Sequence, residues 1–345
     1  MFTIKVLGID LGKSSFHVIV RDKSHNRIFR KKFTRSKLIE FLQQLPACLI
    51  AFEACGGAHW LGRKCLLMGH EVKLIPPQYV KPYVKGNKND FIDAEAISEA
   101  VTRPNMRFVP VKSEQAQTIS AIHNSRQGYV KERTACMSRI GALLLEFGIS
   151  LPQGHSTMKK LFNWLGQQTE KLPPLLIQEL IELHDYYLLL NERIDTQDNK
   201  LKQLTSDSEL GQLLKTIPGI GDMTASYCLA TIDSASEFKN GRNMAAWLGL
   251  VPAQYSTGGR PKLLGISKRG NKTLRTLFVH AARAVLSRPE QTGKVFGNWL
   301  IELRASKPIN VACVALANKL ARIVWAVMKS KQPFNHNKLQ PNLQW

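Results

Sequence analysis

The first hundred residues alternate between short apolar runs and runs whose apolar positions fall on one helical face. Three strand-like runs, at 2–9, 15–21 and 28–33, are separated by turns short enough for antiparallel pairing. The elements expected next are a helix at 36–45, a buried strand at 48–52, a helix at 58–68 and a strand at 71–75. The spacing of Ile92, Ala96 and Ala100 predicts another helix that begins at Asp90.

This order of elements predicts an α/β domain of the ribonuclease-H-like type, in which the first strand is central and the fourth lies beside it. The remainder reads as helices, so the fold class is α/β plus α. We expect a nuclease-like domain at 1–150, a helical linker and coiled coil at 151–205, a mainly helical domain at 206–330 and a disordered tail at 331–345.

A heptad pattern runs through residues 176–204. Two paired registers repeat every seven positions, with Leu180, Tyr187, Ile194 and Leu201 in one, and Leu183, Leu190, Gln197 and Leu204 in the other. Seven of these eight residues are apolar or aromatic, which is typical of a coiled coil. Two interpretations stay open, a dimerisation helix or an amphipathic helix that packs on its own domain.

Four carboxylates lie at the ends of these predicted strands or at the start of a helix. They are Asp10, Glu53, Asp90 and Asp93. Asp90 and Asp93 are three residues apart and can face the same way from the start of a helix. Carboxylates so placed hold Mg²⁺ or Mn²⁺, and such ions serve phosphodiester chemistry. Taken alone, Asp90 or Asp93 reads as a first-turn acid favoured by the helix dipole.

The balance of charge predicts a polyanionic partner. Lys and Arg number 48 against 26 Asp and Glu, which gives a net charge of +22. Residues 239–345 contain 18 of these basic residues and only two acids, Glu290 and Glu302. Since this positive charge is concentrated in the last third of the chain, it favours nucleic acid as the partner.

Cysteine usage and hydropathy favour a cytoplasmic protein without a membrane span. The six cysteines form no CxxC pair and mostly lie in apolar runs, as reduced thiols do. The apolar stretch 311–317 is soon followed by Lys319 and Arg322 and reads as a core helix. Histidines 17, 59, 123, 155 and 280 show no ligand spacing and receive no role.

Two motifs in the last third of the chain suggest contacts with nucleic acid. Residues 217–221, with Gly219 and Gly221, lie between two helix-like runs and resemble a helix-hairpin-helix, whose backbone N–H groups hold phosphate. The alternative is a plain helix connector. The second motif is the loop 255–260, which contains Ser256, Thr257, Gly258 and Gly259 and is followed by the basic residues Arg260, Lys262, Lys268, Arg269, Lys272 and Arg275.

A hydroxyl in this loop can attack phosphorus if a base or a metal activates it, and the cations can stabilise the developing charge. From composition alone, the plainer interpretation is that Ser256 and Thr257 cap a turn or bind phosphate.

Five motifs, in order, resemble the DEDD transposases of bacterial insertion sequences, the IS110/IS1111 family that includes the Piv DNA invertase. The motifs are GIDLGKSSFHV, AFEACGG, NKNDFIDAEAI, LLKTIPGIG and WLGLVPAQYSTGGRPKLLGISKRGNKTLR, and the resemblance spans residues 4–330. It implies a RuvC-like domain, a coiled coil and a C-terminal transposase domain. The family's four acids correspond to Asp10, Glu53, Asp90 and Asp93, and its nucleophilic serine to Ser256, with Thr257 as its neighbour.

The resemblance also implies partners and a mechanism. Members of the family are recombinases guided by a structured bridge or seek RNA, and they act on donor and target DNA as tetramers with composite sites. The expected function is therefore an RNA-guided, Mg²⁺-dependent transposase that cuts and rejoins DNA through Ser256. The alternatives are a hydrolytic RuvC-like nuclease or junction resolvase, a nucleic-acid-binding protein without activity, and an actin-like ATPase.

Overall fold

The chain divides into two compact units, Met1–Gln115 and Ala116–Trp345. The computed structural model describes residues 4–87, 89–152, 154–167, 172–232, 235–258, 260, 262–288 and 295–336. The boundary at 115 assigns a long helix to the second unit, whereas the sequence pattern ended the first domain at 150. Each unit is described by itself below.

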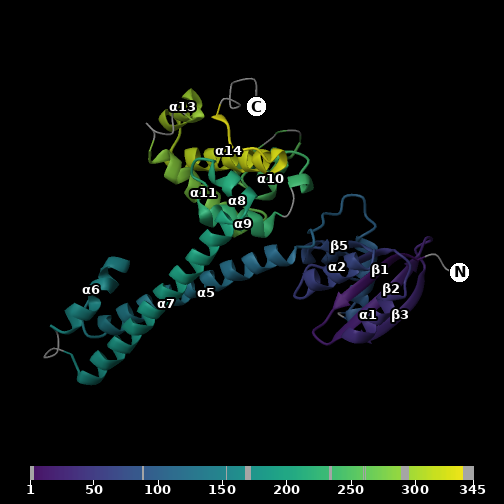
Figure 1. Ribbon diagram of the computed structural model, residues 1–345, viewed down its shortest axis with the longest axis horizontal. Coiled ribbons are helices and arrows are strands. Elements are labelled where there is room, and N and C mark those ends of the chain that lie inside the picture. The colour runs from purple at the N-terminus through teal and green to yellow at the C-terminus, as the bar shows by residue number, and fades with distance from the viewer. Residues whose placement is uncertain are drawn as a thin grey trace. The chain divides into compact units, whose positions relative to one another are not determined.

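The N-terminal unit is built on a five-stranded sheet with the order β3-β2-β1-β4-β5 (Figure 1). The strands are β1 (Ile4–Leu11), β2 (Ser15–Asp22), β3 (Arg27–Thr34), β4 (Leu49–Glu53) and β5 (Glu71–Ile75). The first three pair antiparallel, and β4 is parallel to both β1 and β5. The first strand is central and the fourth lies beside it, as the sequence predicts.

Helices cover both faces of this sheet because side chains alternate along each strand. On one face, Leu7 and Ile9 pack with α1 (Arg35–Gln43) and α2 (Ala58–Leu67). On the other, Val6 packs with α4 (Asp90–Ala100). Between β5 and α4 lie the short helices α3 (Pro77–Val80) and η1 (Lys81–Tyr83).

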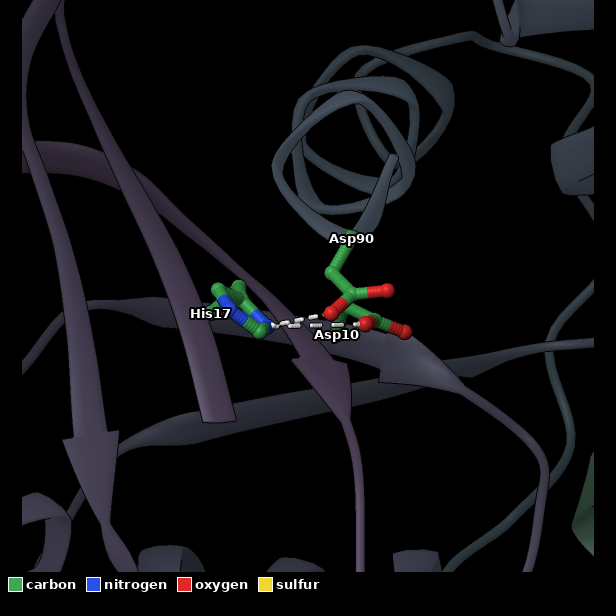
Figure 2. A group of neighbouring side chains, drawn as sticks. All are labelled: Asp10, His17 and Asp90. Carbon is green, nitrogen blue, oxygen red and sulfur yellow. Dashed lines mark ion pairs between the residues drawn. The ribbon is translucent and has the colours of Figure 1, made fainter. Parts of the chain in front are cut away.

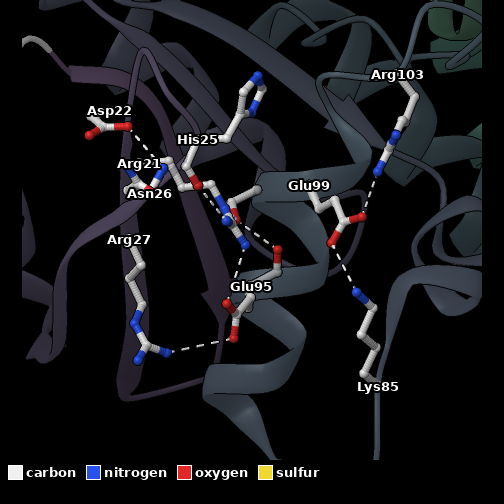
Figure 3. Close-up of polar contacts among 10 residues, drawn as sticks. Arg21, Asp22, His25, Asn26, Arg27, Lys85, Glu95, Glu99 and Arg103 are labelled. Carbon is white, nitrogen blue, oxygen red and sulfur yellow. Dashed lines mark hydrogen bonds and ion pairs between the residues drawn. The ribbon is translucent and has the colours of Figure 1, made fainter.

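Arg21 of β2 fastens α4 to the sheet. Its Nε donates to Ser98 Oγ at 2.8 Å, and its Nη2 donates to Glu95 Oε1 at 3.2 Å (Figure 3). Arg27 of β3 adds an ion pair with Glu95 at 3.7 Å. These contacts fix the helix whose first residue is Asp90.

In the second unit, three helices pack together: α5 (Glu114–Leu145), α6 (His155–Leu165) and α7 (Pro174–Ser206). The heptad residues of α7 that are buried are Leu180, Leu183, Tyr187, Leu190, Ile194 and Leu201. Their cover includes Cys136 and Ile140 of α5 and Leu161 of α6. The heptad face is therefore occupied within the chain, which supports the interpretation that α7 packs on its own domain.

The rest of the second unit surrounds α14 (Ile309–Ser330). It comprises α8 (Glu209–Lys215), α9 (Asp222–Thr231), η2 (Ala235–Glu237), α10 (Gly241–Trp247), β6 (Pro252–Gln254), β7 (Leu263–Ile266), α11 (Lys272–Leu286) and α13 (Asn298–Ser306). The length and hydropathy of α14 would suit a membrane span. Its buried residues, such as Leu316 and Leu320, join the core of this unit, so we assign it as a core helix.

The start of the expected disordered tail is corrected by the structure. Phe334 donates its backbone N–H to Thr216 Oγ1 at 2.8 Å, and its ring packs against the core of the second unit. Residues 337–345 of that tail lie outside the described residues. An aromatic residue in a polar, Pro- and Asn-rich segment was the missed signal.

Candidate active-site residues

Asp10 and His17 face each other across the first hairpin. Asp10 lies near the end of β1, and the antiparallel register pairs it with His17 of β2. The Nδ1 atom of His17 lies 3.9 Å from Asp10 Oδ2 and 3.4 Å from Asp90 Oδ2 (Figure 2). His17 is buried, with 5% of its surface exposed, whereas the Asp90 side chain is 62% exposed. The imidazole thus lies behind two carboxylates, one of which is open to solvent.

The start of α4 brings Asp90 to this point. Asn89 caps the helix, and its side chain accepts a hydrogen bond from the Phe91 N–H at 2.9 Å. The Phe91 ring meets His17 edge-on at 4.6 Å between centroids. The Arg30 guanidinium lies 4.1 Å from the centroid of the same ring. Side chains of β2 and β3 therefore hold the first turn of α4.

A glycine in β1 permits this close approach. A Cβ atom at Gly8 would lie 2.5 Å from the carbonyl oxygen of Ala94 and 2.7 Å from Ser98 Cβ. Since the Ala94 oxygen is backbone, α4 would have to move away from the sheet to admit any larger residue. Gly8 therefore sets the spacing between the strand of Asp10 and the helix of Asp90.

Glu53 ends the strand next to β1. The parallel register pairs Ile9 with Phe52, so Asp10 and Glu53 each follow directly after this pair. Burial raises the pKa of the Cys55 thiol, and the carboxylates of Glu53 and Asp10 raise it further. The parallel register of β1 and β4 thus brings Glu53 to the same end of the sheet as Asp10.

The four predicted acids come together in part. Among the described residues, the potential ligand atoms that lie within 4.8 Å of one another belong to Asp10, His17 and Asp90. Glu53 and Asp93 lie outside that group, although Asp93 shares the first turn of α4 with Asp90.

The donor atoms of this group fit a hard divalent cation. Carboxylate oxygens suit Mg²⁺ or Mn²⁺, and the exposed Asp90 leaves room for water and substrate. Since ligating carboxylates are themselves hydrogen-bonded as a rule, buried His17 is placed to orient Asp10 and Asp90.

His17 belongs to this group with Asp10 and Asp90, although ligand spacing in the sequence did not detect it. The signal lies in the hairpin register, because a short turn at 12–14 places Asp10 opposite residue 17. The Gly12 N–H donates to the Ser15 oxygen at 3.0 Å and closes that turn.

Ser256 lies two residues after the end of the short strand β6, in the hairpin that β6 forms with β7. The Tyr255 N–H donates to the Lys262 oxygen at 2.9 Å, and the Arg260 N–H donates to the Thr257 oxygen at 3.2 Å. Gly258 has a φ of 57°, which glycine adopts readily. Gly259 lies outside the described residues. The hairpin holds Ser256 and Thr257 at an exposed turn.

The Ser256 hydroxyl accepts a hydrogen bond from Gln254 Nε2 at 2.8 Å. Gln254 is an amide and cannot take up the proton that Ser256 would lose on attack. Activation of Ser256 therefore requires a group other than Gln254.

The basic residues after Ser256 differ in their exposure and in their hydrogen bonds. Arg260, Lys262, Lys268, Arg269 and Lys272 are exposed. Arg275 is half-buried and donates from Nη1 to the backbone oxygens of Leu248, at 2.9 Å, and Arg269, at 3.1 Å. Arg275 therefore holds the loop against α11. The side chains of the exposed cations are accessible and suit phosphate contacts.

The two glycines of the helix-hairpin-helix-like motif differ in their surroundings. Gly219 has a φ of 85°, and a Cβ there would lie 2.8 Å from the Ala281 oxygen, so Gly219 is needed for packing on α11. Gly221 precedes α9 and has open space around it. Asp222 begins that helix and pairs with Lys215 at 2.6 Å. Its negative charge opposes phosphate binding at this helix start.

Comparison with known proteins finds two family models in this chain. One, described as the transposase IS116/IS110/IS902 family, matches residues 211–296. The other, a transposase model of the DEDD type in IS110 elements, matches residues 7–149. The first covers the serine hairpin, and the second covers the acid cluster.

Similar proteins extend over nearly the whole chain. The transposase for insertion sequence element IS1328 of Yersinia enterocolitica is 45% identical over 327 residues, which are 95% of this chain and 97% of that protein. The transposase for IS1111A of Coxiella burnetii is 38% identical over 97% of this chain and 92% of its own length. A pilin gene-inverting protein of Moraxella lacunata is 25% identical over 95% of this chain and 97% of its own length.

Proposed function

The chain belongs to the IS110 family of insertion-sequence transposases, enzymes that cut DNA and transfer its strands, and we propose that it is an RNA-guided recombinase whose nucleophile is Ser256. The observation that carries the proposal is the convergence of Asp10 and Asp90 at His17. Two acids from a strand and a helix, backed by a buried imidazole, suit a metal-assisted reaction at phosphorus.

Asp10 and Asp90 would hold Mg²⁺ or Mn²⁺, with Glu53 and Asp93 as further ligands. When bound, the cation would stabilise charge on the phosphate oxygens. His17 keeps the two carboxylates in place from the buried side. The exposed side of Asp90 leaves the phosphate a way in.

The proposed cutting step balances without ATP. Ser256 Oγ bonds to phosphorus, its proton passes to a base, and the bond from phosphorus to one deoxyribose oxygen breaks. That oxygen leaves as a free hydroxyl after protonation. In the reverse step, a hydroxyl of a new DNA strand attacks the phosphoserine and releases Ser256. Exposed cations of the hairpin, such as Arg260 and Lys262, would contact the DNA backbone.

Hydrolysis is a second candidate, because the hydrogen-bond partner of Ser256 is an amide and not a base. In that case, water would attack at the acid cluster, and the protein would be a RuvC-like nuclease. This candidate keeps Asp10 essential and makes Ser256 dispensable.

The proposed partners are donor DNA, target DNA and a structured noncoding RNA. Resemblance to the family and the net charge of +22 support them. We also propose a cytoplasmic homo-oligomer in which dimers form a tetramer and different copies supply the acids and the serine. Since the heptad face of α7 is covered within the chain, the exposed Leu188 and Leu189 of that helix are the better candidates for contact between copies.

The test is a search for a denaturant-stable protein–DNA adduct. The assay uses the protein, RNA co-purified from cells that carry the whole element, Mg²⁺ and labelled donor and target DNA. We expect an adduct that is lost in Ser256→Ala and in Asp10→Asn. Loss with Thr257→Ala alone would move the nucleophile by one residue. Cleavage that makes no adduct and survives Ser256→Ala would establish hydrolysis instead.

A further inference from the structure

A cation from the edge strand of the N-terminal sheet lies beside the acid cluster. Arg30 of β3 is exposed, and its guanidinium lies over the Phe91 ring, 4.1 Å from the ring centroid. Phe91 follows Asp90 at the start of α4, and the same ring meets His17 edge-on. Arg30 is therefore one aromatic ring away from the imidazole that contacts the acids.

The strand register places Arg30 on the same face of the sheet as the acid cluster. Arg30 pairs with Ile19 of β2, and Ile19 lies two residues from His17 on that strand. Since opposed residues of neighbouring strands share a face, as do alternate residues along a strand, Arg30 lies on the face of His17 and α4. The next residue, Lys31, pairs with Val18 and lies on the face that α1 and α2 cover.

The N–H groups of Arg30 are available to a ligand. Within the residues that the structure describes, its guanidinium takes part in no hydrogen bond or ion pair, and it contacts the Phe91 ring. Arg21 and Arg27, by contrast, both pair with Glu95. Carboxylates repel a phosphate, and a fixed cation beside them offsets that repulsion. The position of Arg30 therefore suits an anion that approaches the acid cluster.

We propose that Arg30 binds a phosphate of the DNA strand that is cut, next to the phosphate that the acid cluster receives. The planar guanidinium presents paired N–H donors that match two oxygens of a phosphate. Phe91 holds the guanidinium, and the contact of its ring with His17 fixes the place of Arg30 relative to the acids. The inference rests on the proposed function, because it takes the acid cluster as the place where DNA is cut.

Neutral methylphosphonate linkages test this contact one phosphate at a time. Donor and target DNA carry one such linkage at each position around the cut in turn, and Ser256→Ala protein with its co-purified RNA binds them. Arg30→Ala in this background should weaken binding of unmodified DNA about tenfold or more, the size of a lost charge-assisted hydrogen bond. The neutral linkage that adjoins the cut should weaken binding to the parent protein. It should cost the Arg30→Ala variant nothing further, because the contact is already lost.

Two further variants separate the charge of Arg30 from its packing on the Phe91 ring. Arg30→Met keeps an unbranched stem over the ring and should lose as much affinity as Arg30→Ala. Arg30→Lys keeps the charge without the paired donors, so it should recover part of the affinity. Arg30→Ala should also reduce the slope of log affinity against log salt by about one. Since Arg30 is exposed, thermal unfolding of all three variants should match that of the parent protein.

Lys31→Ala is the matched control on the opposite face of the sheet. Lys31 is exposed, and its Nζ atom lies 5.4 Å from the centroid of the Phe33 ring. The substitution removes the same charge from a cation over an aromatic ring of the same strand. It should change DNA affinity by less than about twofold, and every neutral linkage should keep its effect.

Three outcomes would overturn the proposal. The first is that every neutral linkage keeps its full effect in Arg30→Ala. The second is a loss of co-purified RNA in Arg30→Ala without any coupled DNA position, which would assign Arg30 to RNA. The third is equal loss in Arg30→Ala and Lys31→Ala, which would reflect a general loss of positive charge. If the wild-type protein forms no seryl adduct but the coupled linkage adjoins the cut, the serine mechanism fails and the phosphate contact of Arg30 stands.

Discussion

The acid cluster and the serine hairpin differ in how the chain holds them. Asp10 lies near the end of the central strand and Asp90 at the start of α4, and the strand register, the helix cap and the buried His17 fix both. Ser256 lies in the connection between two strands of three and four residues and is exposed. The fold of the N-terminal unit thus positions the acids, whereas the Ser256 hydroxyl is exposed on a short hairpin.

The largest effect is expected when two inactive variants are mixed, which tests whether different copies supply the acids and the serine. Asp10→Asn and Ser256→Ala should each lower cutting by at least about 10³-fold, as loss of a preorganised charge or a nucleophile does. If different copies supply the acids and the serine, a mixture of the two variants should regain a substantial fraction of wild-type adduct. Adduct formation is measured with each variant alone and with the mixture.

The double variant Asp10→Asn/Ser256→Ala, mixed with wild type, is the control. Its mixture should form less adduct than wild type alone, because every copy of the double variant lacks both groups. No recovery in the mixture of single variants would show that one copy supplies both.

The two units should also differ in their response to acid. Burial lowers the pKa of His123 to about 4, and Arg126 adds to this effect, so the folded second unit favours the neutral ring. His123 Nε2 lies 3.0 Å from Ser226 Oγ and joins α5 to α9. Because the unfolded pKa is near 6.5, the stabilisation is complete above pH 6.5 and is lost as pH falls toward 4.

The expected loss over that window is roughly 3 kcal/mol in the free energy of unfolding. Denaturant unfolding at pH 7 and pH 4.5, followed by a signal from the second unit, measures it. His123→Gln should flatten the dependence because its amide does not titrate. An equal slope in wild type and variant would contradict the assignment to His123.

The fold around the acids could be predicted from sequence because local patterns determine it. Alternation gave the strands, and the order of elements placed Asp10 and Glu53 on neighbouring strands. His17 could not be found by spacing, because its contact with Asp90 depends on tertiary packing of α4 at Gly8. The heptads were visible, but a periodic pattern does not say whether the chain itself or a second copy covers the face. Arg30 gave no local signal either, because its contact with α4 joins segments far apart in sequence.

The substitution His17→Asn tests whether His17 orients the carboxylates of Asp10 and Asp90. The amide keeps a polar group near Asp10 and Asp90 but cannot reproduce the imidazole, so the carboxylates lose their buried support. We expect metal affinity or cutting rate to fall about 10- to 100-fold, as loss of a group that orients metal ligands does. Titration with Mn²⁺ and adduct formation at saturating metal separate weaker binding from slower chemistry.

His59→Asn is the matched control, because His59 lies in the same unit and accepts from the Lys112 N–H at 3.1 Å, outside the acid group. It should leave the metal affinity unchanged. An equal loss of affinity in both variants would mean that His17 acts through general stability.

The smallest expected effects separate support from contact within the serine region. Arg275→Ala removes a charged donor to two backbone oxygens and should lower the free energy of unfolding by about 1.5–3 kcal/mol. Lys272 begins the same helix and is exposed, so Lys272→Ala should change stability by less than about 0.5 kcal/mol. If Lys272 contacts phosphate, its loss should reduce the slope of log affinity against log salt by about one. Thermal unfolding and DNA binding at several salt concentrations measure the two effects, and normal stability of the Arg275 variant would contradict its role in holding the loop.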